Sequence, residues 1–221
     1  MVVKIYGMAS AVCPQRVMLC LIEKKVPFEI ELVDLSKMQH KEPHYMAKQP
    51  FGQIPYIVDG EFELFESRAI IRYYATKYAE TGTKLLGENL EERARIDQWI
   101  DVEAINFNPL VFPIVFNLFI LPKQGLAGNK AEADSFAKRL SKVLNVYEKQ
   151  LSKTKYLAGD HFTLADLTHI PTMRALVEGC GMSCILDDKK FVKAWWEAIR
   201  ARPAVEKVLE FMESGALQYS P

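Results

Sequence analysis

The chain has 221 residues, of which 49% are hydrophobic and 25% are charged, a composition typical of soluble globular proteins. Its 28 basic and 28 acidic residues cancel, so we expect no basic surface that neutralises phosphates and no nucleic-acid partner. The four cysteines lack the paired CxxC spacing of a zinc site and the four histidines are scattered, which predicts no metal and a reducing compartment.

Neither the N-terminus nor the most apolar stretch predicts export or a membrane span. MVVKIYG has no charged segment leading into an apolar one, as a secretory signal would have. The stretch PLVFPIVFNLFILP, residues 109–122, is about 14 residues long and is interrupted by Pro113 and Asn117, so it is too short and too broken to span a bilayer. We therefore expect a cytoplasmic protein with no membrane partner.

The first 80 residues alternate between strand and helix patterns. VVKIYG predicts a strand, PQRVMLCLIEKK an amphipathic helix and FEIELVDL a second strand. IPYIV and EFELF flank Asp59 and Gly60, which together signal a hairpin, and ESRAIIRYYATKYAE predicts a helix. This order predicts a small α/β unit of the thioredoxin type.

From about Leu90 onward the sequence shows only helical periodicity. The change predicts two domains, 1–82 and 90–221. The predicted fold class is α+β, with a thioredoxin-like N-terminal domain followed by an all-α C-terminal domain. Within the second domain, Thr163 and Asp166 have the spacing of a capping box, with Phe162 placed for a hydrophobic staple.

Three short segments of the first domain could meet at one ligand. In FGQIPYIV, Pro55 removes a ladder donor just before a strand; it is either a turn proline or a cis proline that exposes the Ile54 backbone to an extended peptide. In LFESRAI, Glu66 and Ser67 at a helix start either cap that helix or bind the carboxylate and ammonium of an amino acid.

The third segment, QHKEP, offers two candidate cations. His40 and Lys41 lie side by side in a predicted loop. Such a pair is either a cationic part of the ligand site or an ordinary solvated surface.

Taken together, the three segments resemble one family. QHKEP, QPFGQIP and DGEFELFESRAI, in this order and at these distances, closely resemble plant glutathione transferases of the phi class. The segments DQW at 97–99 and FTLADLTH at 162–169 extend the resemblance over nearly the whole chain. The resemblance implies a homodimer that uses glutathione as co-substrate, with a small hydrophobic electrophile, a peroxide or an aromatic molecule as the second ligand.

The resemblance also implies the binding residues. The glycyl carboxylate of glutathione would be bound by His40 and Lys41. The cysteinyl part would be bound by Gln53, Ile54 and the cis Pro55, and the γ-glutamyl head group by Glu66 and Ser67. The hydrophobic acceptor site would comprise Met8, Leu35, Phe116 and Phe119, although the aromatic residues of 109–122, Phe112 included, also suit a helix core.

The opening loop GMASAVCPQRV departs from the family pattern. Phi-class enzymes carry a catalytic serine five residues before the arginine that Arg16 matches, and that position holds Ala11. Ser10 is adjacent and donates to the glutathione sulfur only if the loop is shifted by one residue. Conjugation or peroxide reduction would then depend on Ser10.

Cys13 is the second catalytic candidate. Proline is favoured at the first helical position, so Pro14 predicts Cys13 as the N-cap, where the helix dipole favours a thiolate. The pair resembles the start of the glutaredoxin motif and of cysteine-type transferases, which form a mixed disulfide with glutathione, and this implies thiol-transferase or dehydroascorbate reductase-like activity. The alternative is an inert thiol such as Cys20; Cys180 and Cys184 are interpreted as structural.

The same opening also resembles phi-class members associated with flavonoid binding. For those members the implied role is that of a non-catalytic carrier, or ligandin, for aromatic metabolites. Both roles stay open at the level of the sequence.

Overall fold

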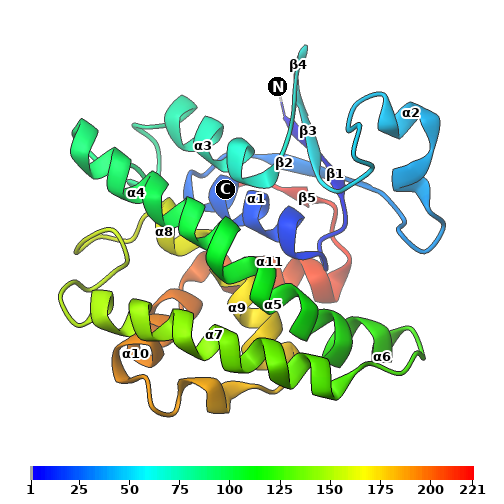
Figure 1. Ribbon diagram of the computed structural model, residues 1–221. Helices are drawn as coiled ribbons and strands as arrows, with labels where there is room; N and C mark the ends of the chain where they lie inside the picture. Colours follow the sequence, from blue (N-terminus) through cyan, green and yellow to red (C-terminus); the bar gives the residue numbers. More distant parts are fainter. Residues whose placement is uncertain (1) are drawn as a thin grey trace. The chain divides into compact units, whose positions relative to one another are not determined.

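The computed structural model describes residues 2–221, which form two compact units (Figure 1). The first unit comprises the chain up to Leu85 together with Arg202–Pro221, and the second comprises Leu86–Ala201. The thioredoxin-like first part and the helical second part confirm the predicted fold class.

The first unit is built on a five-stranded mixed sheet in the order β4-β3-β1-β2-β5. Its strands are β1 (Val3–Gly7), β2 (Phe28–Leu32), β3 (Tyr56–Asp59), β4 (Phe62–Phe65) and β5 (Gln218–Tyr219). The β1–β2 pair is parallel and is connected through helix α1 (Val12–Glu23), whereas the other pairs are antiparallel. The predicted hairpin is present, with Gly60 at φ +67° in its turn.

Alternation of buried and partly exposed residues explains the central strand. Val3, Ile5 and Gly7 of β1 are buried, and the residues between them are half-buried. Helix α1 presents a continuous apolar run to its neighbours and packs against α3 (Ser67–Lys77) and α11 (Pro203–Ser214). Burial of this run stabilises the first unit.

The assignment of residues 202–221 to the helical domain needs correction. These residues form α11 and the strand β5, and β5 pairs with β2 through Phe28 and Tyr219 and so becomes the edge of the sheet. Arg202 also makes a bidentate ion pair with Glu23 of α1, at 2.6 and 2.8 Å. A two-residue strand is too short to show any periodicity, and its partner lies far away in the sequence.

The regular secondary structure of the second unit is helical, apart from an isolated β-bridge between Tyr156 and Gly159. It contains α4 (Leu90–Val102), a π-helical turn (Glu103–Phe107), α5 (Asn108–Val115), a second π-helical turn (Phe116–Ile120), α6 (Leu121–Lys123), α7 (Lys130–Leu151), α8 (Leu164–Leu167), α9 (Ile170–Arg174), a third π-helical turn (Ala175–Gly179), a 3₁₀ turn (Ser183–Leu186) and α10 (Lys190–Arg200). Helix α5 packs along α7 (Figure 1). In the core the buried His169 contacts the rings of Tyr147 and Trp195, and Tyr147 also contacts Trp99.

The predicted capping box at α8 is present. The Thr163 hydroxyl accepts from the Ala165 N–H at 3.3 Å, and the Asp166 carboxylate accepts from the Thr163 N–H at 3.0 Å. Asp166 is fully buried and also accepts from the Leu157 N–H and the Trp195 indole N–H. Burial raises the pKa of Asp166 to about 6 even though these donors favour the carboxylate.

The helical run Leu90–Lys123 is long and apolar enough to cross a membrane by length and composition. A core helix of a soluble protein passes the same test, and a third of the most apolar window is buried in the fold. The cytoplasmic location without a membrane partner therefore stays a prediction.

Candidate functional site

The end of β1 brings the start of α1 next to the Ile54–Pro55 segment. Gly7 closes the strand, and a Cβ atom at this position would lie 2.9 Å from Cγ of Pro14 and 3.6 Å from Cβ of Pro55. The absence of a side chain at Gly7 therefore allows both prolines to approach the strand. The two segments that carry Cys13 and Ile54 thus meet within the first unit.

The structure corrects the predicted N-cap of α1. The N-cap is Ala11, the helix begins at Val12, and Cys13 and Pro14 are its second and third residues. Because none of the first four N–H groups of a helix has an intrahelical acceptor, proline fits the third position as well as the first. Cys13 is half-buried in the first turn, while Ser10 is exposed in the preceding loop.

Arg16 connects this helix start to the start of α3. Its side chain is completely buried, and its Nη1 donates to the Ser67 Oγ at 2.8 Å and contacts the Cys13 Sγ at 3.5 Å. Sequence analysis used Arg16 only to align the family motif and missed this role. A charged residue just before the apolar residues 17–22 of this predicted amphipathic helix is the signal that points to it.

Ser67 is the first residue of α3 and is 4% exposed. The N-cap before it is Glu66, which has φ +69° and an exposed side chain that makes no capping hydrogen bond. Positive φ is uncommon for residues other than glycine and clusters at functional sites. The first backbone N–H groups of α3 have no intrahelical acceptor, so this end of the helix suits an anionic group.

The Ile54–Pro55 peptide bond is cis, as the resemblance implies. Strand β3 begins at Tyr56, so the Ile54 backbone lies outside the ladder, and Ile54 itself is half-buried. The backbone of Gln53 is fixed on both sides, since its C=O accepts from the Tyr45 hydroxyl at 2.8 Å and its N–H donates to the Gln49 side chain at 3.1 Å. The side chain of Gln53 is exposed.

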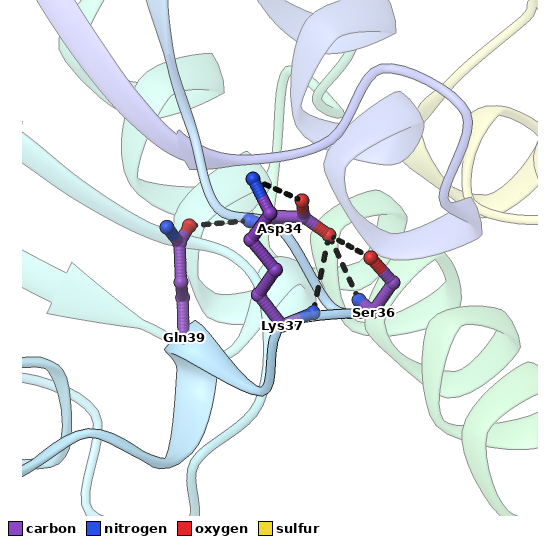
Figure 2. A network of polar contacts seen from close by, with 4 residues as sticks. All are labelled: Asp34, Ser36, Lys37 and Gln39. Carbon is purple, nitrogen blue, oxygen red and sulfur yellow. Dashed lines mark hydrogen bonds and ion pairs between the residues drawn. The ribbon is translucent and has the colours of Figure 1, made fainter.

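A polar network holds the loop that leads to His40 and Lys41 (Figure 2). The Asp34 carboxylate accepts from the Ser36 N–H at 2.9 Å and the Ser36 hydroxyl at 2.6 Å, and the hydroxyl bond is the main reason why the pKa of Asp34 is lowered. The Asp34 N–H donates to the Gln39 side chain at 2.7 Å. These bonds set the direction of the 3₁₀ turn Gln39–Lys41.

The two candidate cations of this turn are not equivalent. Lys41 Nζ already donates to the carbonyls of Phe51 and Gly52, at 3.2 and 2.8 Å, and so ties its loop to the one before Pro55. Burial, and then the charge of Lys41, lower the pKa of His40, which favours the neutral imidazole. Its Nδ1 is buried and has no hydrogen-bond partner among the described residues.

The residues expected at the acceptor site lie in both units. Met8, in the loop after β1, and Leu35, after β2, are half-buried in the first unit. In the second unit, Phe112 and Phe116 are 56% and 40% exposed and stack with ring centroids 6.0 Å apart.

Phe119 is more constrained than its neighbours. Its ring lies 3.3 Å from the position that a Cβ atom would take if Gly179 had a side chain. Lys123 Nζ lies over the same ring, 4.2 Å from its centroid. The acceptor site itself stays a prediction.

The comparisons with known proteins agree with this arrangement. Residues 1–76 match the family "Glutathione S-transferase, N-terminal domain" and residues 107–203 match "Glutathione S-transferase, C-terminal domain". The chain belongs to the glutathione S-transferase family. It is 48% identical to glutathione S-transferase F11 and 47% identical to F12 of Arabidopsis thaliana, over 95% of this chain and 98% of each relative.

Solved structures show the same relationship. The chain superimposes on glutathione transferase F7 from Populus trichocarpa with a TM-score of 0.91 and 44% identity, covering 96% of this chain and 99% of the other. Glutathione S-transferase I from maize, in complex with an atrazine glutathione conjugate, gives a TM-score of 0.88 and 38% identity, with 98% and 100% covered. These results confirm a plant phi-class glutathione transferase.

The remaining cysteines of the transferase differ from Cys13. Cys20 is fully buried, and burial raises its pKa to about 12, which agrees with the inert interpretation. Burial also raises the pKa of Cys180, to about 11, whereas Cys184 is exposed. No group of three metal-ligating side chains occurs within residues 2–221, and the absence of a metal stays a prediction.

Proposed function

We propose that this transferase binds glutathione along the three segments of the first unit. The observation that carries the proposal is the start of α3, where Ser67 is buried beside free helix N–H groups and is held by Arg16. There Ser67 and the helix start bind the γ-glutamyl carboxylate, and Glu66 binds the ammonium group. The Ile54 backbone pairs with the cysteinyl part, with Gln53 and Pro55 beside it, and His40 and Lys41 face the glycyl carboxylate.

Two sulfur reactions are compatible with the opening loop. In conjugation, the glutathione thiolate attacks an electrophilic carbon, a C–S bond forms, the leaving group departs with its electron pair and the thiol proton goes to solvent. Ser10 would donate a hydrogen bond to the sulfur. The same sulfur chemistry reduces a peroxide: the O–O bond breaks, the peroxide becomes an alcohol and water with the two thiol protons, and two glutathione molecules are oxidised to the disulfide.

In thiol transfer, Cys13 is the nucleophile. Its thiolate attacks the glutathione sulfur of a disulfide between glutathione and a second thiol, which forms a mixed disulfide of Cys13 with glutathione and releases the second thiol as a thiolate. A free glutathione thiolate then attacks the glutathione sulfur of this mixed disulfide, which forms oxidised glutathione and frees Cys13. A dehydroascorbate reductase-like activity would use the same cysteine.

Replacing Ser67 by Ala is expected to weaken glutathione binding about 10- to 150-fold, which corresponds to about 1.5–3 kcal/mol for a hydrogen bond to a charged group. Titration calorimetry of the variant measures this loss. The matched control is Ser214→Ala, which removes a serine hydroxyl at the end of α11 and should leave the affinity unchanged. An unaltered dissociation constant for Ser67→Ala would contradict the mapped site.

Glutathione binding is expected to take up a proton at His40. The pKa of His40 is lowered by burial and by Lys41, and a bound carboxylate favours the imidazolium and raises this pKa again. Affinity should therefore rise as the pH falls from about 8 to about 6, where histidine titrates. Calorimetry in two buffers of different ionisation enthalpy measures the proton uptake, which should disappear in His40→Asn.

We also propose a homodimer, on the family relationship. Sedimentation at micromolar concentration should give twice the 25.2 kDa mass of one chain. A sedimentation profile of monomer alone across the micromolar range counts decisively against it, because association follows mass action.

The second candidate function is that of a carrier for flavonoids or other aromatic metabolites. The stacked, exposed rings of Phe112 and Phe116 offer two aromatic faces to such a ligand. A conjugation assay with an electrophilic aryl halide separates the two roles. A carrier would bind flavonoid with no turnover, and Phe116→Ala would weaken that binding.

A further inference from the structure

Arg16 presents only hydrogen-bond donors to the groups around it. Its side chain is completely buried, and Nη1 lies 2.8 Å from the Ser67 Oγ and 3.5 Å from the Cys13 Sγ. A guanidinium carries five N–H groups and no acceptor, and Nη1 carries two of those hydrogens. Both contacts can therefore be made at the same time, with the oxygen and the sulfur accepting.

The direction of the Arg16–Ser67 hydrogen bond fixes the polarity of Ser67. A serine hydroxyl has one O–H donor and two acceptor lone pairs, and it normally rotates to suit its surroundings. Because Arg16 must donate, the Ser67 oxygen accepts and its own proton stays available for another group. The backbone N–H groups at the start of α3 are also donors. Toward a carboxylate, the Ser67 hydroxyl and these N–H groups all act as donors, which favours a carboxylate over a donor such as an amide NH₂.

We propose that Arg16 is a positioning residue that fixes the Ser67 hydroxyl with its proton directed toward the carboxylate of the bound amino-acid head group. Through the same nitrogen Arg16 holds the Cys13 sulfur in place beside that hydroxyl. The Ser67 half of this proposal rests on the proposed glutathione site. The Cys13 half stands without it.

The test compares two ligands that differ only at the γ-glutamyl α-carboxylate: S-hexylglutathione and its α-carboxamide analogue. The wild-type enzyme should prefer the carboxylate about tenfold or more, as for a hydrogen bond to a charged group. Arg16→Met should lose most of this preference, whereas a purely structural defect would weaken both ligands equally and keep their ratio. Arg16→Lys retains a charged donor and should recover part of the preference.

A double-mutant cycle decides whether Arg16 acts through Ser67. If it does, Arg16→Met has no further effect on S-hexylglutathione affinity in a Ser67→Ala background. Additive losses overturn the proposal, and so does an unchanged preference in Arg16→Met. The matched control is Arg202→Met, which removes the Glu23 ion pair in the same unit and should leave the preference intact.

Alkylation by iodoacetamide without any ligand tests the Cys13 half. Cys184 is exposed and serves as the internal reference. The ratio of Cys13 to Cys184 labelling should fall at least threefold in Arg16→Met and less in Arg16→Lys. An unchanged ratio overturns this half.

If Arg16→Met does not fold, the carboxylate preference and the labelling ratio of Arg16→Lys decide the two halves of the proposal. A wild-type enzyme that binds neither ligand overturns the proposed function and the Ser67 half with it, whereas the labelling ratio still decides the Cys13 half.

Discussion

Replacing Asp166 by Ala is expected to destabilise the second unit by about 3 kcal/mol at pH 7. The change leaves the Leu157 N–H, the Thr163 N–H and the Trp195 indole N–H buried without their acceptor. Each costs about 1–3 kcal/mol, so the loss is roughly 6 kcal/mol. Burial raises the pKa of this carboxyl group to about 6, so removing the buried charge stabilises the fold by about 3 kcal/mol at neutral pH. Urea denaturation measures the net loss in the free energy of unfolding.

The pH dependence of this loss has a definite sign. Because the folded pKa of Asp166 lies above its ordinary value of 3.8, its protonation contributes stability below about pH 4 that is lost as the pH rises through about 6. The destabilisation by Asp166→Ala should therefore be larger at pH 4 than at pH 7. Asp160→Ala is the matched control, since this exposed aspartate accepts one bond from the Lys155 N–H at 3.2 Å. A loss below 0.5 kcal/mol at both pH values, the size of an ordinary surface change, would refute the prediction.

Local patterns predicted most of the fold because the signals act over a few residues. Alternation in FEIELVDL identified β2, the Asp59 and Gly60 pair identified the hairpin, and the spacing of Thr163 and Asp166 identified the capping box. Each depends on backbone geometry within one or two turns of chain. These elements are present in the structure, with strand ends that differ from the predicted segments by one to three residues.

What the sequence did not predict depends on contacts between distant residues. The strand β5 has two residues and exists because β2 offers a free edge. The start of α1 was misplaced because proline is compatible with several first-turn positions, and which one it takes is decided by the rest of the loop.

The motifs and their spacing predicted which residues belong to the candidate site, but they did not predict the contacts between those residues. The Arg16–Ser67 bond joins residues 51 positions apart, so no local pattern signals it. The lowered pKa of His40 likewise depends on burial, which the motif QHKEP does not reveal. Family resemblance named the residues, and the structure supplies their hydrogen-bond polarity.

Replacing Cys13 by Ser is expected to abolish thiol transfer and to leave conjugation largely intact. Cys13 lies in the first turn of α1, where the helix dipole favours an anion, and Arg16 Nη1 is 3.5 Å from its sulfur. Serine retains the size of the side chain but cannot form a disulfide. Ser10→Ala should show the opposite pattern, with conjugation lowered about 100-fold through loss of one donor to the sulfur.

The two losses separate because the two reactions need different groups. Thiol transfer needs a nucleophilic sulfur on the protein, whereas conjugation needs a hydrogen-bond donor to the sulfur of glutathione. Cys184→Ser, which replaces an exposed cysteine of the second unit, is the control and should change neither rate. Mass spectrometry after treatment with oxidised glutathione should find one adduct, on Cys13. If no adduct forms there and Cys13→Ser keeps full thiol-transferase activity, Cys13 is an inert thiol like Cys20, and the chemistry of this enzyme depends on the glutathione sulfur alone.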